Sequence, residues 1–269
     1  HIFHEESLES APNPPYFKGE SRKNYFERTS FTRNQWVELK EFCEKKLKID
    51  FFSTPFSIAA IELLESIGVH TFKIPSGDVN NTPFLERIAR TKKKVVLSTG
   101  MSSWDDIDSA VEILQSNNCG ELIILQCTSA YPCPPELSGL NIIEELSSRY
   151  KNIKIGYSDH TNGHTIPLAA VIKGACFIEK HFTLSKKMYG SDALNATEPE
   201  EFKELVMAIR VLEDAILNPV DKDQVAESLH NMKDTFEKSI VLSRPLNKGH
   251  KLRFDDLAFK KPGDGIKAN

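Results

Sequence analysis

The stretch Leu122-Ile-Ile-Leu-Gln-Cys-Thr-Ser129 is an apolar run that stops abruptly in small polar residues. A run of this kind is typical of a buried parallel strand, because both faces of a parallel sheet are covered. The same pattern occurs six times along the chain, at residues 49–55, 71–77, 95–101, 122–129, 153–160 and 177–183. In a β/α barrel the chemistry gathers where the strands end, so the repeat predicts both a fold and the position of an active site.

Segments with helical spacing lie between these runs. Residues 58–67, 104–114 and 201–216 place apolar side chains at every third or fourth position. Strands that alternate with amphipathic helices indicate βαβ units with right-handed crossovers. The rival architecture is an open doubly wound sheet, which usually carries a Gly-rich phosphate-binding turn after its first strand. Neither common form of that turn occurs in the sequence, so we favour a barrel.

A closed barrel needs eight strands, and six apolar runs are visible. Residues 1–29 are rich in Pro, Ser, Glu and Lys and do not resemble a strand. We therefore expect an α/β fold, a TIM (β/α)8 barrel that lacks its first strands in this chain or is open. The expected order is an irregular segment at 1–30, the barrel at 31–218, a polar linker at 219–237 and the start of a small β-rich domain at 238–269, too short to build its own core.

The composition is that of a globular protein: 269 residues, 40% hydrophobic, with a net charge of -4. This slightly acidic balance gives no electrostatic footprint for nucleic acid or a membrane surface. No signal peptide and no run of about 18 apolar residues is present, so we expect a cytoplasmic protein. The five cysteines form no Cys-x-x-Cys pair, which favours free thiols over a zinc site or disulfides.

Two histidines at matched strand ends are the strongest chemical signal. His160 and His181 each follow an apolar run, and neighbouring strands lie about 4.8 Å apart. Two imidazoles can then converge on one divalent ion and leave positions open for water and substrate. The alternative is that one or both only form hydrogen bonds within the barrel mouth. Strand alternation predicts that Glu179 shares the face of His181, whereas Lys180 points away and forms an ion pair.

A second set of side chains suits a dianionic substrate, because cationic and hydroxyl donors follow three successive strands. These residues are Lys73, Ser76, Ser98, Thr99, Thr128, Ser129 and Tyr131. Phosphate fits such a set better than a sugar alone. The alternative is that each serine has an ordinary role in a turn and that Lys73 is a solvent-exposed strand end.

Five motifs follow one another along the chain: Lys73-Ile-Pro-Ser-Gly, Leu97-Ser-Thr-Gly-Met, Gln126-Cys-Thr-Ser-Ala-Tyr-Pro, Gly156-Tyr-Ser-Asp-His-Thr and Ile178-Glu-Lys-His-Phe-Thr-Leu. In this order they closely resemble the N-acetylneuraminate (sialic acid) synthase family, which is NeuB-like and includes the legionaminic and pseudaminic acid synthases. The resemblance covers residues 31–216. It implies a TIM barrel followed by an SAF (antifreeze-like) domain from about Lys238, in a domain-swapped homodimer. It also implies an enzyme that condenses phosphoenolpyruvate with N-acetylmannosamine or a related N-acetylated amino sugar.

The resemblance also implies roles for single residues. His160 and His181 would bind manganese, or magnesium, and Lys73 would join them in catalysis. The phosphoenolpyruvate site would be lined by Thr54, Lys73, Ser76, Ser98, Ser129, Tyr131 and Ser158, and Asp192 would bind the sugar acceptor. In the implied reaction the metal polarises the sugar aldehyde, C3 of phosphoenolpyruvate attacks it, and water adds at C2 before phosphate leaves.

The chain departs from the family pattern in three places. The family's first two strand motifs, which carry a Glu, an Asn-His pair and Lys-x-Gln, are absent, and the SAF domain is short. The family's Asp-His-x-x-Ser reads Asp192-Ala-Leu-Asn-Ala196. This form resembles the pseudaminic branch, whereas Lys73-Ile-Pro-Ser-Gly favours the sialic and legionaminic branch. Two other functions stay open: a metal-independent Schiff-base aldolase that uses Lys73, and a non-catalytic ligand-binding relative or inactive fragment.

Overall fold

The computed structural model describes residues 19–190 and 192–267. The chain divides into two compact units, of which the first ends at Glu213 and the second begins at Asp214. No helix in the described residues combines the length and the apolar character that a membrane crossing requires. The division falls five residues before the expected end of the barrel at 218.

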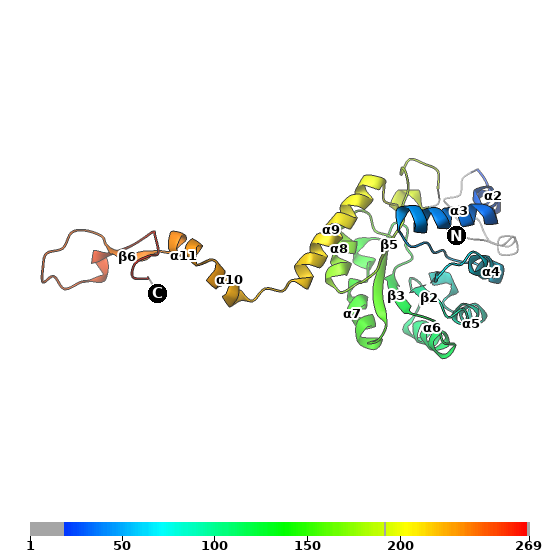
Figure 1. Ribbon diagram of the computed structural model, residues 1–269, viewed down its shortest axis with the longest axis horizontal. Coiled ribbons are helices and arrows are strands. Elements are labelled where there is room, and N and C mark those ends of the chain that lie inside the picture. The colour runs from blue at the N-terminus through cyan, green and yellow to red at the C-terminus, as the bar shows by residue number, and fades with distance from the viewer. Residues whose placement is uncertain (1–18, 191, 268–269) are drawn as a thin grey trace. The chain divides into compact units, whose positions relative to one another are not determined.

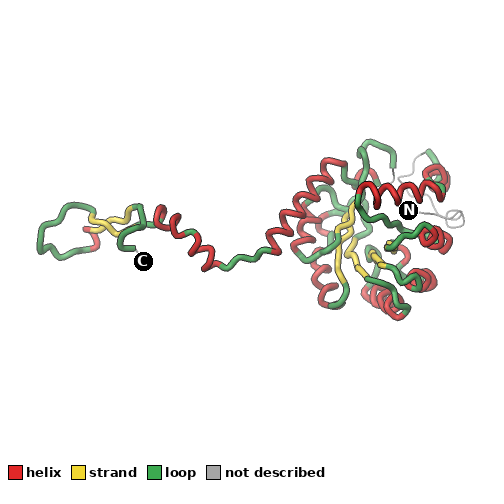
Figure 2. Tube along the Cα trace, in the orientation of Figure 1, coloured by secondary structure: helices red, strands yellow, loops and turns green. Residues whose placement is uncertain are grey.

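A five-stranded parallel sheet forms the centre of the first unit (Figure 2). Its strands pair in the order of the sequence: β1 (Thr71–Ile74), β2 (Lys94–Ser98), β3 (Leu122–Cys127), β4 (Lys154–Asp159) and β5 (Ile178–Lys180). A doubly wound sheet would reverse its strand order at a switch point, whereas a β/α barrel keeps the order of the chain. The predicted α/β fold with a parallel sheet is therefore confirmed, and the described strands form a half-barrel.

The first of the six apolar runs, residues 49–55, does not form a strand. Ser53 pairs in parallel with Phe72 as an isolated bridge, and Pro55 is also a single bridge residue. The run then reaches Pro55, which has no backbone N–H to donate to a neighbouring strand. The expectation of six strands is therefore wrong by one within the described residues.

Helices alternate with the strands along the chain and lie around the outside of the sheet (Figure 1). They are α4 (Ile58–Ser66), α5 (Thr82–Ala89), α6 (Trp104–Ser116), α7 (Leu140–Arg149), α8 (Thr165–Ile172) and α9 (Pro199–Leu217). Short 3-10 turns occur at η2 (Ser76–Asp78), η3 (Pro135–Leu137) and η4 (Ala193–Asn195). The three helices predicted from apolar spacing are confirmed as α4, α6 and α9. Serine side chains cap α4 and α6, since Ser57 and Ser103 accept hydrogen bonds from backbone N–H groups of the first turn.

Two further helices, α2 (Arg22–Thr29) and α3 (Arg33–Glu41), precede α4, and α3 continues into the π-helix η1 (Phe42–Leu47). The expectation of an irregular segment at 1–30 is therefore wrong for α2, and residues 1–18 lie outside the described part. The sequence of α2 has no apolar stripe from which a helix could be predicted. Its ends are stabilised locally, because Ser21 caps the first turn and Arg28 pairs with Glu20 at 2.7 Å.

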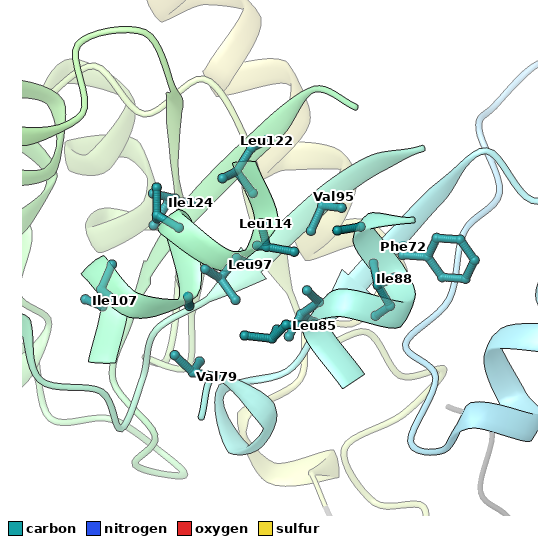
Figure 3. Packing of buried hydrophobic residues seen from close by; sticks show 14 of the residues in the cluster. Phe72, Val79, Leu85, Ile88, Val95, Leu97, Ile107, Leu114, Leu122 and Ile124 are labelled. Carbon is teal, nitrogen blue, oxygen red and sulfur yellow. The ribbon is translucent and has the colours of Figure 1, made fainter. Parts of the chain in front are cut away.

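The main core lies between the sheet and its helices (Figure 3). Val95 and Leu97 of β2 are fully buried there, against helix residues such as Leu85 and Leu114. Because strand side chains alternate between faces, Val96 points to the opposite, inner face of the sheet. A second cluster forms there from Val96, Ile123 and Leu125, with Phe177 partly buried against it. Gly156 also belongs to this region, since a Cβ at that position would lie 2.6 Å from Leu125 Cδ2.

The second unit contains α10 (Lys222–Ser228), α11 (His230–Phe236), β6 (Ser239–Leu242), η5 (Phe254–Asp256) and β7 (Leu257–Lys260). Strands β6 and β7 form an antiparallel pair, which agrees with the expected β-rich segment after 238. The expected linker at 219–237 is not an irregular segment, because it contains α10 and α11. Asp221 explains the start of α10, because its carboxylate accepts hydrogen bonds from two backbone N–H groups of the first turn.

Candidate active site

A cavity of about 800 Å³ opens where strands β1 to β5 end. Nine of the ten predicted site residues belong to its wall: Thr54, Lys73, Ser76, Ser98, Ser129, Tyr131, Ser158, His160 and His181. The tenth, Asp192, lines a neighbouring cavity of about 250 Å³, which shares His181 and Phe182 with the first. The structure therefore brings the predicted residues together at one edge of the sheet, with Asp192 next to them.

The two histidines lie side by side. They directly follow Asp159 and Lys180, which are register partners in β4 and β5. The centroids of the His160 and His181 rings are 5.2 Å apart, and their planes are inclined by 33°. The Tyr131 ring packs against both, with centroid distances of 4.1 Å to His160 and 5.9 Å to His181. Parallel pairing of β4 with β5 thus places the imidazoles next to each other.

The tautomer of His160 is set by the backbone. Its Nδ1 lies 2.9 Å from the carbonyl oxygen of Thr128. A carbonyl only accepts, so Nδ1 carries the proton and Nε2 keeps its lone pair. Burial alone would lower the pKa of His160, but the hydrogen bond and charge of Cys127, followed by the Thr128 carbonyl, raise it overall. The Cys127 sulfur lies 3.8 Å from Nδ1.

The environment of His181 lowers the pKa of its imidazole. Burial lowers the pKa of His181, and the positive charge of a protonated His160 lowers it further, although Asp192 and Glu179 act against both. A neutral imidazole is the form that binds a metal ion. The buried ring of His181 therefore stays in the ligand form to a lower pH than an exposed histidine would.

These imidazoles fit a divalent cation as part of an open site. Within residues 19–190 and 192–267, no group of three or more His, Cys, Asp or Glu side chains is arranged to hold a metal ion. The described part of the chain would therefore supply two nitrogen ligands, His160 and His181. Other positions would be left for water and substrate, as in catalytic rather than structural metal sites.

Lys73 is buried, with 6% of its surface exposed, so the alternative of a solvent-exposed strand end is wrong. Its Nζ lies 3.5 Å from Glu179 Oε1. The same carboxylate oxygen accepts a hydrogen bond of 2.7 Å from the Ser158 hydroxyl. Glu179 and His181 both belong to the cavity wall, as strand alternation predicted. The carboxylate therefore holds Lys73 and Ser158 together at the base of the cavity.

Gly100 is the centre of a cluster that the sequence analysis missed. Its N–H donates a hydrogen bond of 2.9 Å to Ser76 Oγ. A Cβ at this position would lie 2.4 Å from Ser129 Oγ and 2.8 Å from Cys127 Sγ, so only glycine allows these groups to approach. The signal available in the sequence was the glycine of the Ser-Thr-Gly-Met motif, which follows directly after a strand.

Two hydroxyls predicted to face the substrate have other partners. Thr99 donates a hydrogen bond of 2.9 Å to the carbonyl of Leu125, and Thr128 donates one of 2.7 Å to that of Leu137. Neither threonine belongs to the cavity wall. The prediction is therefore wrong for these two, because local backbone acceptors compete for short hydroxyl side chains.

The predicted ion pair of Lys180 is confirmed, and its partner is Asp159 on the neighbouring strand. Lys180 Nζ lies 2.5 Å from Asp159 Oδ2, and the side chains are 2% and 0% exposed. Both residues also contribute to the cavity wall, so the expectation that Lys180 lies away from the site is only partly met. All five cysteines are free, as expected.

A sequentially ordered parallel sheet with a polar cavity at its carboxyl edge defines a protein of the β/α-barrel class. Comparison with known proteins gives the family. The chain belongs to the NeuB family, whose model matches residues 4–221. The resemblance seen in the five motifs is therefore confirmed.

Three similar proteins illustrate this relationship. The uncharacterized protein MJ1065 of Methanocaldococcus jannaschii is 42% identical, over 90% of this chain and 70% of its own length. The N,N'-diacetyllegionaminic acid synthase of Campylobacter jejuni is 39% identical, over 83% of this chain and 67% of its own length. A solved N-acetylneuraminic acid synthetase from Leptospira borgpetersenii, in complex with citrate, matches with a TM-score of 0.72 at 35% identity, over 80% of this chain and 76% of that one.

Proposed function

We propose that this chain forms the catalytic part of a sialic-acid-type synthase, which condenses phosphoenolpyruvate with N-acetylmannosamine or a related amino sugar. The product would be a nonulosonic acid, with release of phosphate. Relatives named as synthases of legionaminic acid in Campylobacter jejuni, N-acetylneuraminate 9-phosphate in Homo sapiens and pseudaminic acid in Helicobacter pylori support this. The observation that carries the proposal is one cavity that contains both imidazoles together with Lys73 and the serine hydroxyls.

The anionic donor would bind at Lys73 and the hydroxyls around Gly100. An ammonium group and converging hydroxyls suit phosphate and carboxylate oxygens. The charged partner of Lys73 among the described residues is Glu179, at a distance of 3.5 Å that leaves the ammonium able to contact a second anion. In the reaction, C3 of phosphoenolpyruvate would attack the aldehyde carbon of the open-chain sugar, and water would add at C2 before phosphate departs. Lys73 would balance the charge on the phosphate throughout.

His160 and His181 would hold a divalent metal ion, Mn²⁺ in the first place and Mg²⁺ as the alternative. A metal ion at this position would polarise the sugar aldehyde as a Lewis acid. The protein prepares the two ligands in different ways. The carbonyl of Thr128 orients the His160 ring through Nδ1, and Tyr131 packs against both rings.

The sugar acceptor would lie between the histidines and Asp192. The smaller cavity contains Asp192 and shares His181 with the larger one, so a sugar bound there would place its reactive end beside the imidazoles. A carboxylate suits a polyhydroxylated acceptor, because it accepts hydrogen bonds from hydroxyl groups. The homodimer, the SAF identity of residues after 238 and a cytoplasmic location remain predictions of the sequence analysis.

A phosphate-release assay tests the proposed reaction. The full chain is incubated with Mn²⁺, phosphoenolpyruvate and a panel of N-acetylated mannose derivatives. We expect phosphate release that requires both a sugar and the metal. Release with none of the sugars, while phosphoenolpyruvate still binds, would favour the non-catalytic relative.

A trapping experiment tests the Schiff-base aldolase. Such an enzyme needs a neutral amine as nucleophile, whereas Lys73 lies beside a carboxylate. Borohydride treatment in the presence of pyruvate should therefore leave Lys73 unmodified. A covalent adduct on Lys73 would replace the metal-dependent mechanism by the aldolase.

A further inference from the structure

Strands β4 and β5 approach the active site as a ladder of matched residues. Tyr157 pairs with Ile178, Ser158 with Glu179 and Asp159 with Lys180. The next residues on the two chains are His160 and His181, whose ring centroids are 5.2 Å apart. The ion pair is thus formed by the residues directly before the two histidines.

Successive steps of this ladder use opposite faces of the sheet. The Ser158 hydroxyl donates to Glu179 at 2.7 Å on the cavity face. The next step, Asp159 to Lys180, is an ion pair of 2.5 Å between side chains that are 0% and 2% exposed, although both residues also border the cavity. The imidazole rings of the next two residues, His160 and His181, lie on the cavity face again. A slip of one residue in β5 would exchange these faces and bring Lys180 toward the position of His181.

The ion pair belongs to a closed network. Asp159 Oδ1 accepts hydrogen bonds of 3.0 Å from the backbone N–H of Thr161 and 2.8 Å from its hydroxyl. Lys180 Nζ also donates a hydrogen bond of 2.8 Å to the Thr161 carbonyl. Removing two charges from water is costly, so a buried ion pair is weak evidence for stability. The best-attested role of such a pair is to fix register.

Strand β5 has few apolar contacts that fix its position, and the backbone directly after it is held by Thr197, whose N–H donates a hydrogen bond of 2.7 Å to the His181 carbonyl. The strand consists of three residues, all half-buried, and it pairs only with β4 among the described strands. By contrast, β4 is buried at five of its six positions. The apolar pattern that sets register in the central strands is therefore almost absent from β5.

We propose that the Asp159–Lys180 ion pair is the register lock that holds the imidazole of His181 beside that of His160. Asp159 and Lys180 are positioning residues, since they act through the histidines. The inference rests on the proposed function only in giving the imidazoles a metal to bind. The position of the rings themselves is a property of the metal-free protein.

The test uses a neutral pair, Asp159→Asn with Lys180→Met, in the full chain. Either substitution alone would leave a buried charge without its partner, and the protein could then fail to fold. The matched control is Glu121→Gln with Lys154→Met, which removes an exposed ion pair of 2.7 Å at the opposite end of β4, together with the exposed contact of 2.8 Å between Glu121 and Lys94. Two readouts are compared: the ¹⁵N signals of the imidazoles in metal-free protein and the affinity for Mn²⁺ measured by electron paramagnetic resonance.

We expect the neutral pair to fold, with shifted and broadened signals from His160 and His181 and a Mn²⁺ affinity about 10- to 100-fold weaker. The control should keep the original signals and affinity. A folded neutral pair with unchanged signals would overturn the register lock. If the unmodified chain does not bind Mn²⁺, the proposed metal role fails, and the imidazole signals alone decide on the lock.

A milder variant keeps the test decisive if the neutral pair does not fold. Thr161→Val removes the 2.8 Å hydrogen bond to Asp159 and nearly preserves the shape of a side chain that is 1% exposed. We expect the same imidazole signals to shift, with a Mn²⁺ affinity about 3-fold weaker. Unchanged signals in folded Thr161→Val would also overturn the lock.

Discussion

Strands β3 and β5 belong to the same sheet and are held in place by different forces. All six residues of β3 are buried, and it pairs with neighbours on both sides. All three residues of β5 are half-buried, and the sequence that follows begins with His181. The comparison shows that apolar burial fixes the centre of the sheet, whereas polar contacts position the strand end that carries chemistry.

The largest expected effect comes from the end of β5. His181→Ala removes one of two proposed metal ligands, and Lewis-acid polarisation contributes several kcal/mol to a transition state. We therefore expect sugar-dependent phosphate release to fall at least about 10³-fold, with little change in the melting temperature. The control is His70→Ala, an exposed histidine before β1. Equal losses in the two variants would contradict the proposed role of His181.

In the centre of β3 we expect a substitution to lower stability strongly and to leave activity nearly unchanged. Ile124 is fully buried in the main core, so Ile124→Ala should lower the free energy of unfolding by about 2–5 kcal/mol. Folded enzyme should keep most of its activity per molecule. Urea denaturation measures the difference, with Ile172→Ala as the control because Ile172 is 63% exposed. A loss below about 1 kcal/mol at Ile124 would contradict the importance of apolar burial there.

A single added methyl group should distinguish the hydroxyl cluster around Gly100 from another part of the cavity wall, at Gly77. In Gly100→Ala the new Cβ would displace Ser129 Oγ and Cys127 Sγ, from which it would be only 2.4 and 2.8 Å away. We expect the KM for phosphoenolpyruvate to rise about tenfold, or 1.4 kcal/mol. In the control, Gly77→Ala, the nearest atom would be Met101 Cε at 3.9 Å. Similar KM values for both variants would contradict the proposed role of the hydroxyl cluster in binding phosphoenolpyruvate.

The smallest expected effect is a shift in pH dependence. The pKa of His160 is raised and that of His181 is lowered, so as the pH falls His160 takes up a proton first and Mn²⁺ binding weakens with it. Cys127→Ala removes a group that raises the pKa of His160. The loss of Mn²⁺ affinity should therefore occur at lower pH, within the range of about 5 to 8 where histidine titrates. Titration of Mn²⁺ binding against pH checks the direction, and a shift to higher pH would contradict it.

The sequence predicted the parts of this molecule that depend on local pattern. The continuous apolar run of β3 and the spacing of α6 identified both elements, and position after a strand identified His160 and His181. The run at 49–55 shows the limit, since its Phe-Phe pair looks like part of a strand, whereas the run forms only isolated bridges, one of them from Ser53 to Phe72 of β1. Gly100 and Cys127 were missed because their importance comes from contacts between strands. Thr99 was misassigned because its hydroxyl bonds to a carbonyl 26 residues away.

The small inner cluster of Val96, Ile123 and Leu125 has a consequence for the chemistry above it. Val96 lies two residues before Ser98, and Gly156 lies two residues before Ser158, so the cluster forms the layer directly beneath the cavity. Its apolar side chains give the site a floor of low dielectric constant. Charges on Lys73, Glu179 and a bound anion therefore interact more strongly than they would in water.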